Sequence, residues 1–455
     1  MIRKLTLILL FFASASSAQQ NDSLTIRRFY NEALTNGKAY PWLDSLSNKI
    51  GGRLSGSPQA AKAVGYVKAE LTNLQLDNVT LQDVMVPHWV RGTKELGMVV
   101  GGIHQIPLSI CALGGSIGTQ KEGLRASVVE IHEWDDLKKL GKEKIKGKIV
   151  FINHPMKPEF INTFEAYGEA AGYRWSSAMQ AASYGAVGVV VRSMTLLKDD
   201  NPHTGAMGYV DSIVKIPACA ISIVGAERLI NALKKDSTLQ MYMNLHCEKL
   251  ADTLSYNVIG EIKGSQYPDE IIVVGGHLDS WDLAKGAQDD GAGVVQSMEV
   301  LNLFKTLHIQ PKRTIRCVIY MNEENGGKGG ERYAELAKKN HEKNIVAIES
   351  DEGGFSPRGF SFNGDSLQML HIMKWKNLFL QYGIYDWQKG YGGSDINHLK
   401  DQGTMLMGLN PDSQRYFDYH HAATDTFDKV NRRELELGAA SMASLIWLIS
   451  EYGLK

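Results

Sequence analysis

Four short apolar runs in the second half of the chain each lead into polar residues and glycines. Ile271–Val274, Arg316–Met321, Ile345–Ile348 and Met405–Leu409 have the length and composition of buried strands. His-Leu-Asp, Asn-Glu-Glu and Glu-Ser-Asp follow the first three, and a loop joins the fourth to a Tyr-His-His triplet. Open α/β sheets bind ligands at the carboxyl ends of their strands. The pattern therefore predicts an α/β fold with one site built from several strand ends.

Helical spacing of apolar residues marks both ends of the chain. Ser23–Leu34 and Ala61–Leu74 predict two early helices, and Val79–Val86 predicts a strand after them. Asp365–Tyr382 and Arg433–Tyr452 predict two long late helices. The last of these carries the apolar face that is typical of a helix covering a core.

Between residues 102 and 250 the pattern changes, and glycine becomes dense at the start of this stretch. Strand-like and helix-like runs alternate, which predicts a second, smaller α/β module. The strand-like runs are Ala126–Ile131, Lys148–Ile152, Ala186–Val191 and Ile216–Ile223, and the helix-like runs are Trp175–Tyr184 and Ala226–Lys234. Leu254–Lys263 then predicts a return to the first sheet, so this module interrupts the larger part of the fold.

The length, composition and charge of the chain restrict the kinds of protein that it can be. A chain of 455 residues exceeds one hydrophobic core, so two or three domains are expected. Its 44% hydrophobic and 22% charged residues are ordinary for a globular enzyme. A net charge of −1 gives no basic excess to meet phosphates, which argues against nucleic-acid binding. The four cysteines include no Cys-x-x-Cys pair, and the sequence leaves open whether any of them form a disulfide.

The first eighteen residues, Met1–Ala18, predict an export signal. Arg3 and Lys4 precede the apolar run Leu5–Phe12, and small residues fit cleavage before Gln19. This run is too short to span a bilayer, and no other segment is long enough. We therefore expect an exported protein, periplasmic or secreted, without a membrane span.

The polar residues at the predicted strand ends combine imidazole and carboxylate groups. Histidine nitrogen and carboxylate oxygen together suit a borderline metal such as zinc, and carboxylates that bridge two ions are typical of co-catalytic sites. Taken singly, such residues are usually structural or belong to turns. The prediction of a metal site therefore rests on their joint occurrence at successive strand ends.

Five motifs carry a resemblance to a known family: GGHLDSWD, GAQDDGAG, NEENGG, ESDEGG and YHHAATDT, in this order between Gly275 and Thr426. They resemble the co-catalytic zinc exopeptidases, which include bacterial leucyl aminopeptidase, glutamate carboxypeptidase and the transferrin receptor, and most of all the plasma glutamate carboxypeptidase branch. The resemblance implies a three-layer α/β/α catalytic domain, residues 19–101 and 251–455, interrupted by a protease-associated domain at residues 102–250.

The same resemblance implies five ligands for two zinc ions: His277, Asp289, Glu324, Asp351 and His421. Asp289 would bridge the two ions, and Asp279 would orient His277. Glu323 would be the general base toward the attacking water.

Some family members carry an oxyanion-stabilising tyrosine directly before the last histidine ligand. Here His420 stands at that position and Tyr419 lies one residue further back, so the oxyanion-stabilising residue stays open. Two loop residues are also ambiguous. Arg53 is predicted to pair with a surface acid rather than approach the site, and Asp395 either recognises a substrate amine or stabilises its own loop.

We therefore expect a secreted di-zinc exopeptidase acting on peptide substrates, namely dipeptides and short unblocked peptides. A general zinc aminopeptidase is the alternative within the family. Glutaminyl cyclisation on the same fold needs only one zinc, which the two-ion ligand set disfavours. A receptor-like binding protein is the alternative of a different class, but such proteins have lost metal residues that are all present here. Family members often dimerise, so a homodimer is expected by analogy.

Overall fold

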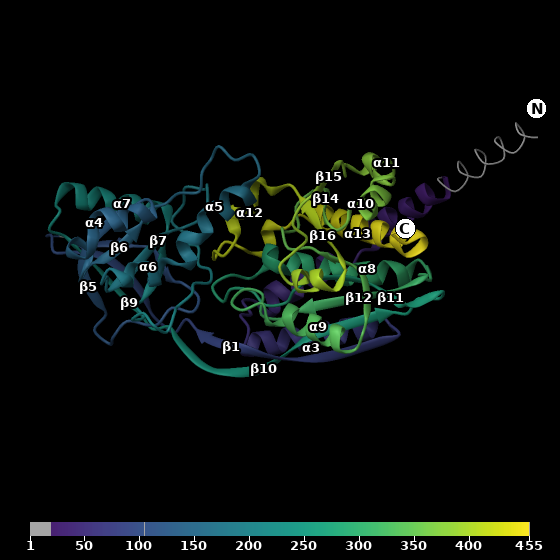
Figure 1. Cartoon of the computed structure of the whole chain (residues 1–455), viewed down its shortest axis with the longest axis horizontal. Helices are drawn as coiled ribbons and strands as arrows, with labels where there is room; N and C mark the ends of the chain where they lie inside the picture. Colours follow the sequence, from purple (N-terminus) through teal and green to yellow (C-terminus); the bar gives the residue numbers. More distant parts are fainter. Residues whose placement is uncertain (1–19, 104, 455) are drawn as a thin grey trace, which may run out of the picture.

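The computed structural model describes residues 20–103 and 105–454, which form two lobes (Figure 1). Each lobe is built on one eight-stranded sheet. In the larger lobe the strands are, in spatial order, β1 (Asn78–Val90), β10 (Glu248–Ile262), β12 (Arg313–Tyr320), β11 (Tyr267–His277), β13 (Lys343–Glu349), β16 (Met405–Pro411), β14 (Pro357–Asn363) and β15 (Asp386–Lys389).

The larger sheet is covered by helices on both faces, because its central strands are apolar on both sides. Ile272 of β11 packs in the apolar cluster that also contains residues of α8 (Ala292–Thr306) and α13 (Arg432–Tyr452). Val273, the next residue, packs with α9 (Lys328–Lys339) on the opposite face. The predicted α/β/α arrangement is confirmed.

The four apolar runs of the sequence are neighbouring parallel strands. β11 pairs in parallel with β12 on one side and with β13 on the other, and β13 pairs in parallel with β16. Their carboxyl ends therefore meet at one edge of the sheet, which places the polar residues that follow them close together.

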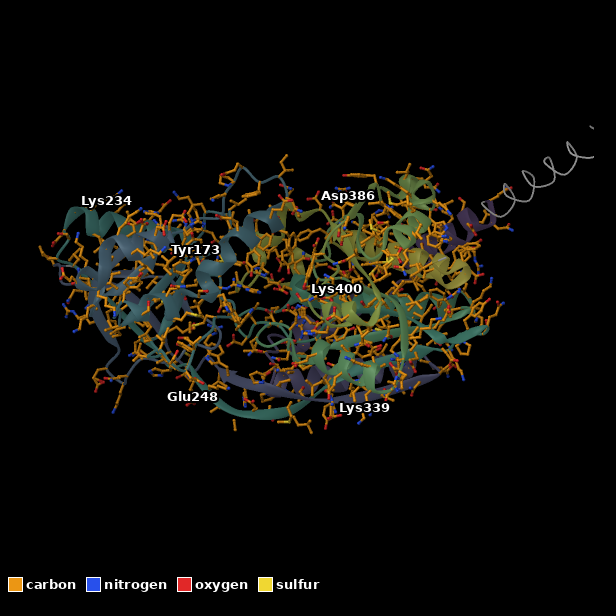
Figure 2. The ribbon with its side chains drawn as sticks, viewed as in Figure 1. Tyr173, Lys234, Glu248, Lys339, Asp386 and Lys400 are labelled. Atoms are coloured by element: carbon orange, nitrogen blue, oxygen red, sulfur yellow. The ribbon has the colours of Figure 1, made fainter. Side chains whose placement is uncertain are left out.

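The chain leaves the larger sheet through β1 and returns through β10, which form a long antiparallel ribbon from Asn78↔Glu261 to Val90↔Glu248. Residues 95–245, here called the inserted lobe, lie between these strands and are visible around Tyr173 and Lys234 in Figure 2. Their sheet has the order β3-β2-β9-β5-β6-β7-β8-β4. Its strands are β2 (Glu95–Val100), β3 (Ile106–Leu108), β4 (Ile110–Ala112), β5 (Leu124–Ile131), β6 (Ile149–Ile152), β7 (Gly188–Arg192), β8 (Ala218–Ile221) and β9 (Gln240–Leu245), and its helices are α4 (Trp134–Ile145), α5 (Thr163–Trp175), α6 (Ser177–Ser183) and α7 (Ile223–Lys235).

The single helix predicted over Asp365–Tyr382 is wrong. It is broken into α10 (Ser366–Met373) and α11 (Lys376–Phe379), followed by a short 3₁₀ turn. The backbone N–H groups of Lys374 and Trp375 bond to carbonyls three residues back, which tightens the chain where Trp375 turns into the core.

The helix predicted over Trp175–Tyr184 is confirmed as α6, which spans Ser177–Ser183, and Trp175 is the last residue of the preceding helix α5. Helix α5 escaped prediction although its buried positions follow a helical spacing. Two of those buried residues, Thr163 and Arg174, are polar, so the apolar periodicity that marks a helix in a sequence is absent.

The four cysteines are free and buried. Cys111 of β4 faces Ala220 in the ladder, whereas Cys219 of β8 faces Ala112. The two thiols therefore point to opposite faces of the sheet, and a disulfide between them is excluded.

The first described element is a helix over residues 20–36, and α3 (Pro58–Asn73) begins at an N-cap, Ser57. Both agree with the predicted early helices. The predicted export signal, Met1–Ala18, lies outside the described residues. Within the described part of the chain, every helix is too short or too polar to cross a bilayer.

Candidate metal centre

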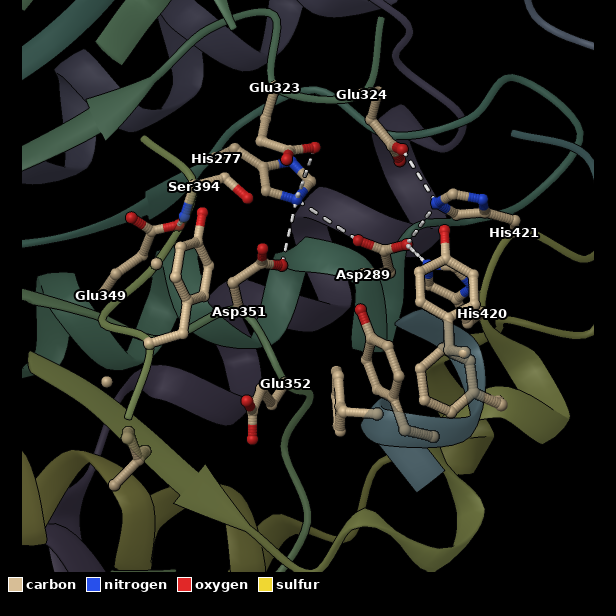
Figure 3. A pocket seen from close by; sticks show the side chains of 18 of the residues that line it. His277, Asp289, Glu323, Glu324, Glu349, Asp351, Glu352, Ser394, His420 and His421 are labelled. Carbon is tan, nitrogen blue, oxygen red and sulfur yellow. Dashed lines mark hydrogen bonds and ion pairs between the residues drawn. The ribbon is translucent and has the colours of Figure 1, made fainter. Parts of the chain in front are cut away.

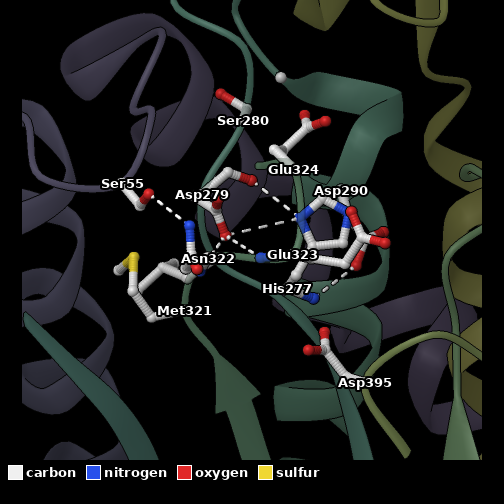
Figure 4. Close-up of polar contacts among 12 residues, drawn as sticks. Ser55, His277, Asp279, Ser280, Asp290, Met321, Asn322, Glu323, Glu324 and Asp395 are labelled. Atoms are coloured by element: carbon white, nitrogen blue, oxygen red, sulfur yellow. Dashed lines mark hydrogen bonds and ion pairs between the residues drawn. The ribbon is translucent and has the colours of Figure 1, made fainter. Parts of the chain in front are cut away.

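The carboxyl ends of the parallel strands bring all seven predicted site residues into one cluster, of which Figure 3 shows six and Figure 4 shows Asp279. The contributing segments lie far apart in the sequence. His277 ends β11, Glu323 and Glu324 follow β12, Asp351 follows β13, Asp279 lies just beyond His277, Asp289 precedes α8, and His421 follows α12 (Tyr416–Tyr419).

Within this cluster the five predicted ligands form two triads that share one carboxylate. His277 Nε2 lies 3.3 Å from Asp289 Oδ1 and 3.2 Å from Asp351 Oδ1. On the other side, His421 Nε2 lies 3.3 Å from Asp289 Oδ2 and 3.1 Å from Glu324 Oε2. Each oxygen of Asp289 thus faces a different imidazole, as a carboxylate that bridges two ions requires.

The spacing of these atoms fits zinc. Zinc bonds nitrogen and oxygen ligands at about 2.0–2.1 Å, and a tetrahedral arrangement then separates neighbouring ligand atoms by about 3.3 Å. Asp289 Oδ2 is also buried without a hydrogen-bond partner. Burial, followed by repulsion from Asp289, raises the pKa of Glu324 well above its usual range. A cation bound among these groups would satisfy the orphan oxygen and offset the repulsion.

Backbone carbonyls set the orientation of both imidazoles. His277 Nδ1 lies 3.0 Å from the carbonyl oxygen of Asp279, and His421 Nδ1 lies 3.3 Å from the carbonyl oxygen of Thr204. Because a carbonyl only accepts, each Nδ1 carries the hydrogen, and each Nε2 keeps a lone pair for a metal.

The side-chain carboxylate of Asp279 makes different contacts from its backbone carbonyl (Figure 4). Its Oδ1 accepts hydrogen bonds from the backbone N–H groups of Asn322 at 2.6 Å and Glu323 at 3.1 Å, and it lies 4.0 Å from His277 Nδ1. The Asn322 side chain in turn donates to Ser55 Oγ at 2.8 Å. Asp279 therefore positions His277 through its main chain and the Glu323 segment through its side chain.

Glu323 lies beside the triads without belonging to either. Its Oε2 is 4.0 Å from His277 Nε2, and its side chain is 24% exposed toward the cavity. Burial, together with Asp351 and other acids, raises the pKa of Glu323 to about 7, although His277 acts in the opposite direction. A carboxylate with a pKa near neutrality that faces a cavity can accept a proton and return it.

Two neighbours of the predicted ligands are less suited to bind a metal. The carboxylate of Asp290 lies within ligand distance of His277 and Asp351, but each of its oxygens already accepts a backbone hydrogen bond at 3.0 Å, one from His277 and one from Gly293. His420 Nε2 lies 3.7 Å from Asp289 Oδ2, and the His420 ring stacks on His421 with 3.5 Å between centroids. His421, which contacts two predicted ligands more closely, fits the ligand position better than His420.

Two residues of the inserted lobe make hydrogen bonds to the backbone of His420 and His421. His203 Nδ1 lies 2.7 Å from the His420 carbonyl oxygen, and the Thr204 N–H donates to the His421 carbonyl at 2.9 Å. His421 has a φ of 61°, in the left-handed region that is uncommon for residues other than glycine. Two hydrogen bonds stabilise it there: the Thr204 N–H donates to the His421 carbonyl, and the His421 Nδ1–H donates to the Thr204 carbonyl.

One loop residue differs from expectation, and one of the two alternatives left open for a second is excluded. Arg53 was predicted to pair with a surface acid, but it is fully buried and donates to the backbone carbonyls of Leu278, Lys285 and Gly286. It therefore shapes the loop between His277 and Asp289 from within. Asp395 is only 1% exposed and is absent from the residues lining the cavity, so it is not placed to meet a substrate amine.

The cavity above the triads has a volume of about 390 Å³ and is lined by both lobes. Phe164, Tyr167 and Arg174 of α5 and Ala206 come from the inserted lobe. Sequence reasoning missed these residues. They share no motif with the ligands, and α5 lacks the apolar pattern that would have revealed it.

Comparison with known proteins shows the family to which the chain belongs. The family described as Peptidase family M28 matches residues 257–446. Carboxypeptidase Q from Mus musculus is 34% identical over 91% of this chain and 86% of its own length, and Carboxypeptidase Q from Xenopus laevis is 37% identical over 91% and 85%.

Solved structures show the same fold. A peptidase M28 precursor from Shewanella amazonensis superposes with a TM-score of 0.90 at 34% identity, covering 95% of this chain and 97% of the other. A zinc aminopeptidase from Bacillus subtilis superposes with a TM-score of 0.65 at 20% identity, covering 91% and 95%. With relatives above 30% identity over most of both chains, the protein belongs to peptidase family M28 and is a zinc metallopeptidase, as its motifs indicated.

Proposed function

We propose that the chain is a di-zinc exopeptidase that hydrolyses dipeptides and short peptides with a free amino terminus. The observation that carries the proposal is the pair of triads sharing Asp289, with Glu323 beside them. His277, Asp289 and Asp351 would hold one ion, and His421, Asp289 and Glu324 the other. The similarity to proteins named Carboxypeptidase Q supports an exopeptidase.

The chain's own residues supply positioning and proton transfer. Bound zinc would polarise the scissile carbonyl and lower the pKa of water from about 15.7 toward 7. Glu323 takes the proton of the attacking water at its carboxylate and passes it to the leaving amine. Asp279 holds the backbone of Glu323, so this carboxylate stays at a fixed place relative to His277.

The shape of the site favours a chain end over an internal segment. The cavity is lined by residues of α5 of the inserted lobe and by Phe417 and His420, and six carboxylate side chains line it as well. A small acidic cavity suits a free ammonium group, whereas an acetyl cap removes the charge and adds bulk. Carboxylates left free of zinc, such as Glu352, are available to this ammonium group.

A panel of free and N-acetylated dipeptides tests the proposal. We expect capping to lower kcat/KM by about 10- to 100-fold, because hydrogen bonds to charged groups are worth about 1.5–3 kcal/mol. Equal cleavage of both forms, or internal cuts in a folded protein, would refute it. Tripeptides cleaved as fast as dipeptides would favour the general aminopeptidase instead.

We also propose that the chain is exported, on the strength of its first eighteen residues. Amino-terminal sequencing of the protein from its native host is expected to start at or near Gln19. Recovery of Met1 on the active protein would contradict export. The homodimer inferred by analogy stays a prediction.

A further inference from the structure

Glu349 is a buried carboxylate that accepts three hydrogen bonds from the backbone of one loop. It ends β13 and is 2% exposed. Its Oε1 accepts from the N–H groups of Ser394 at 3.0 Å and Asp395 at 3.4 Å, and its Oε2 accepts from the N–H of Ile396 at 3.0 Å. Hydrogen bonds to a charged acceptor are stronger than those between neutral groups. Both oxygens of Glu349 are therefore committed to this loop.

The loop that these bonds hold forms part of the cavity wall of the metal centre. Four of its residues line the cavity: Tyr391, Gly392, Gly393 and Ser394. Glu349 and Ser394 lie side by side in Figure 3. At the other end of the loop, the Tyr391 carbonyl accepts from Ser361 Oγ. The loop is thus attached to the larger sheet at both of its ends.

Two glycines allow this loop to lie directly against the ends of the strands. A Cβ atom on Gly392 would lie 2.7 Å from Leu406 Cβ and 3.0 Å from Met407 N of β16, and one on Gly393 would lie 2.4 Å from Glu349 Cδ. Gly393 also has a φ of 150°, which residues with a side chain rarely adopt. Close contact between the loop and Glu349 therefore requires glycine at both positions.

We propose that Glu349 is a positioning residue, whose carboxylate holds the Tyr391–Ser394 wall of the cavity in the place where substrate can bind. Glu349 belongs to neither triad, so its effect passes through the loop. A loop that moves off the strand ends takes up part of the cavity of about 390 Å³. Substrate then binds only to molecules whose wall is in place, and its apparent affinity falls with their fraction. The identity of the substrate rests on the proposed function, whereas the attachment of the loop does not.

Glu349→Gln tests the attachment with little change of shape. The three N–H donors use both oxygens of Glu349, so glutamine places its NH₂ group against at least one of them in either orientation. We expect the amide hydrogens of residues 394–396 to exchange with solvent about 10- to 100-fold faster, the factor that corresponds to one hydrogen bond to a charged group. KM for a free dipeptide should rise by a similar factor, with a much smaller change in kcat and with zinc content at the wild-type value. Hydrogen exchange, steady-state kinetics and metal analysis of the zinc-loaded enzyme measure these quantities.

Glu436→Gln is the matched control. Glu436 is 1% exposed, accepts from the backbone N–H of Tyr40 at 3.3 Å and does not line the cavity. This variant should leave the KM and the exchange of residues 394–396 unchanged, whatever it does to the melting temperature.

Gly393→Ala tests the same contact from the other side, because its methyl group displaces the loop while the carboxylate of Glu349 remains. We expect it to raise KM in the same way. The double variant with Glu349→Gln should be no worse than the worse single variant, since both changes act through one contact. If Glu349→Gln failed to fold, exchange and KM in Gly393→Ala would decide.

Unchanged exchange of residues 394–396 in Glu349→Gln would overturn the inference, whatever the substrate. A lower melting temperature and kcat at an unchanged KM would show a general structural role and would also overturn it, as would additive effects in the double variant. A wild-type enzyme that cleaves no dipeptide would refute the proposed function instead. The exchange rates alone would then decide whether Glu349 holds the loop.

Discussion

Replacing Glu323 with glutamine is expected to lower kcat by about 10²- to 10⁴-fold, the usual cost of removing a positioned general base. Glutamine keeps the shape of the side chain but cannot accept a proton. Because Glu323 lies outside both triads, zinc content should remain at the wild-type level. Steady-state kinetics combined with metal analysis of the purified variant measures both quantities.

The adjacent Glu324→Gln variant provides the contrast. Glu324 Oε2 lies 3.1 Å from His421 Nε2, and its Oε1 accepts from the backbone N–H of Trp281 at 3.0 Å. We expect this variant to lose bound zinc together with activity. If Glu323→Gln lost zinc and Glu324→Gln retained it, the two glutamates would have the opposite roles.

His421→Ala is expected to remove one of the two zinc ions and to lower kcat/KM by more than about 100-fold. Changes to groups that merely orient a ligand already cost about 10- to 100-fold in affinity or activity, and His421 is a ligand in our assignment. Since bound metal stabilises the folded state, the melting temperature in the presence of zinc should also fall. Metal analysis and thermal unfolding measure these effects.

His420→Ala is the matched control for His421→Ala, because the two rings are adjacent and similarly buried. We expect it to retain both ions. A variant of His420 that lost one ion while His421→Ala kept two would reverse the assignment. Full activity in a preparation with one zinc per chain would contradict the two-ion site altogether.

The parts of this protein that could be predicted are those that local sequence encodes. Parallel strands are buried on both faces, so Ile271–Val274 and its neighbours appear as continuous apolar runs. The residues directly after such runs must lie at the carboxyl edge of the sheet. His277, Asp351 and the Glu323 segment therefore fell into one cluster without any knowledge of long-range contacts.

The parts that could not be predicted depend on contacts between distant segments. Arg53 is separated from its acceptor Leu278 by more than two hundred residues, and a lone arginine in a glycine-rich loop resembles a surface residue. Thr204 and Arg174 reach the site only because the inserted lobe folds back over it. Neither the type of these residues nor their spacing in the sequence predicts that they contact the site, because only tertiary packing brings them there.

The contact between Thr204 and His421 limits how this enzyme can be re-engineered. A truncated catalyst made by joining β1 directly to β10 would retain every predicted ligand and the general base. It would nevertheless lack Thr204, whose carbonyl accepts from His421 Nδ1. It would also lack the hydrogen bond from the Thr204 N–H to the His421 carbonyl, which holds His421 at its unusual φ. With His421 assigned as a ligand, we therefore expect the inserted lobe to belong to the minimal catalytic unit. Chimeras with other exopeptidases would have to exchange residues 95–245 and the His420–His421 loop together.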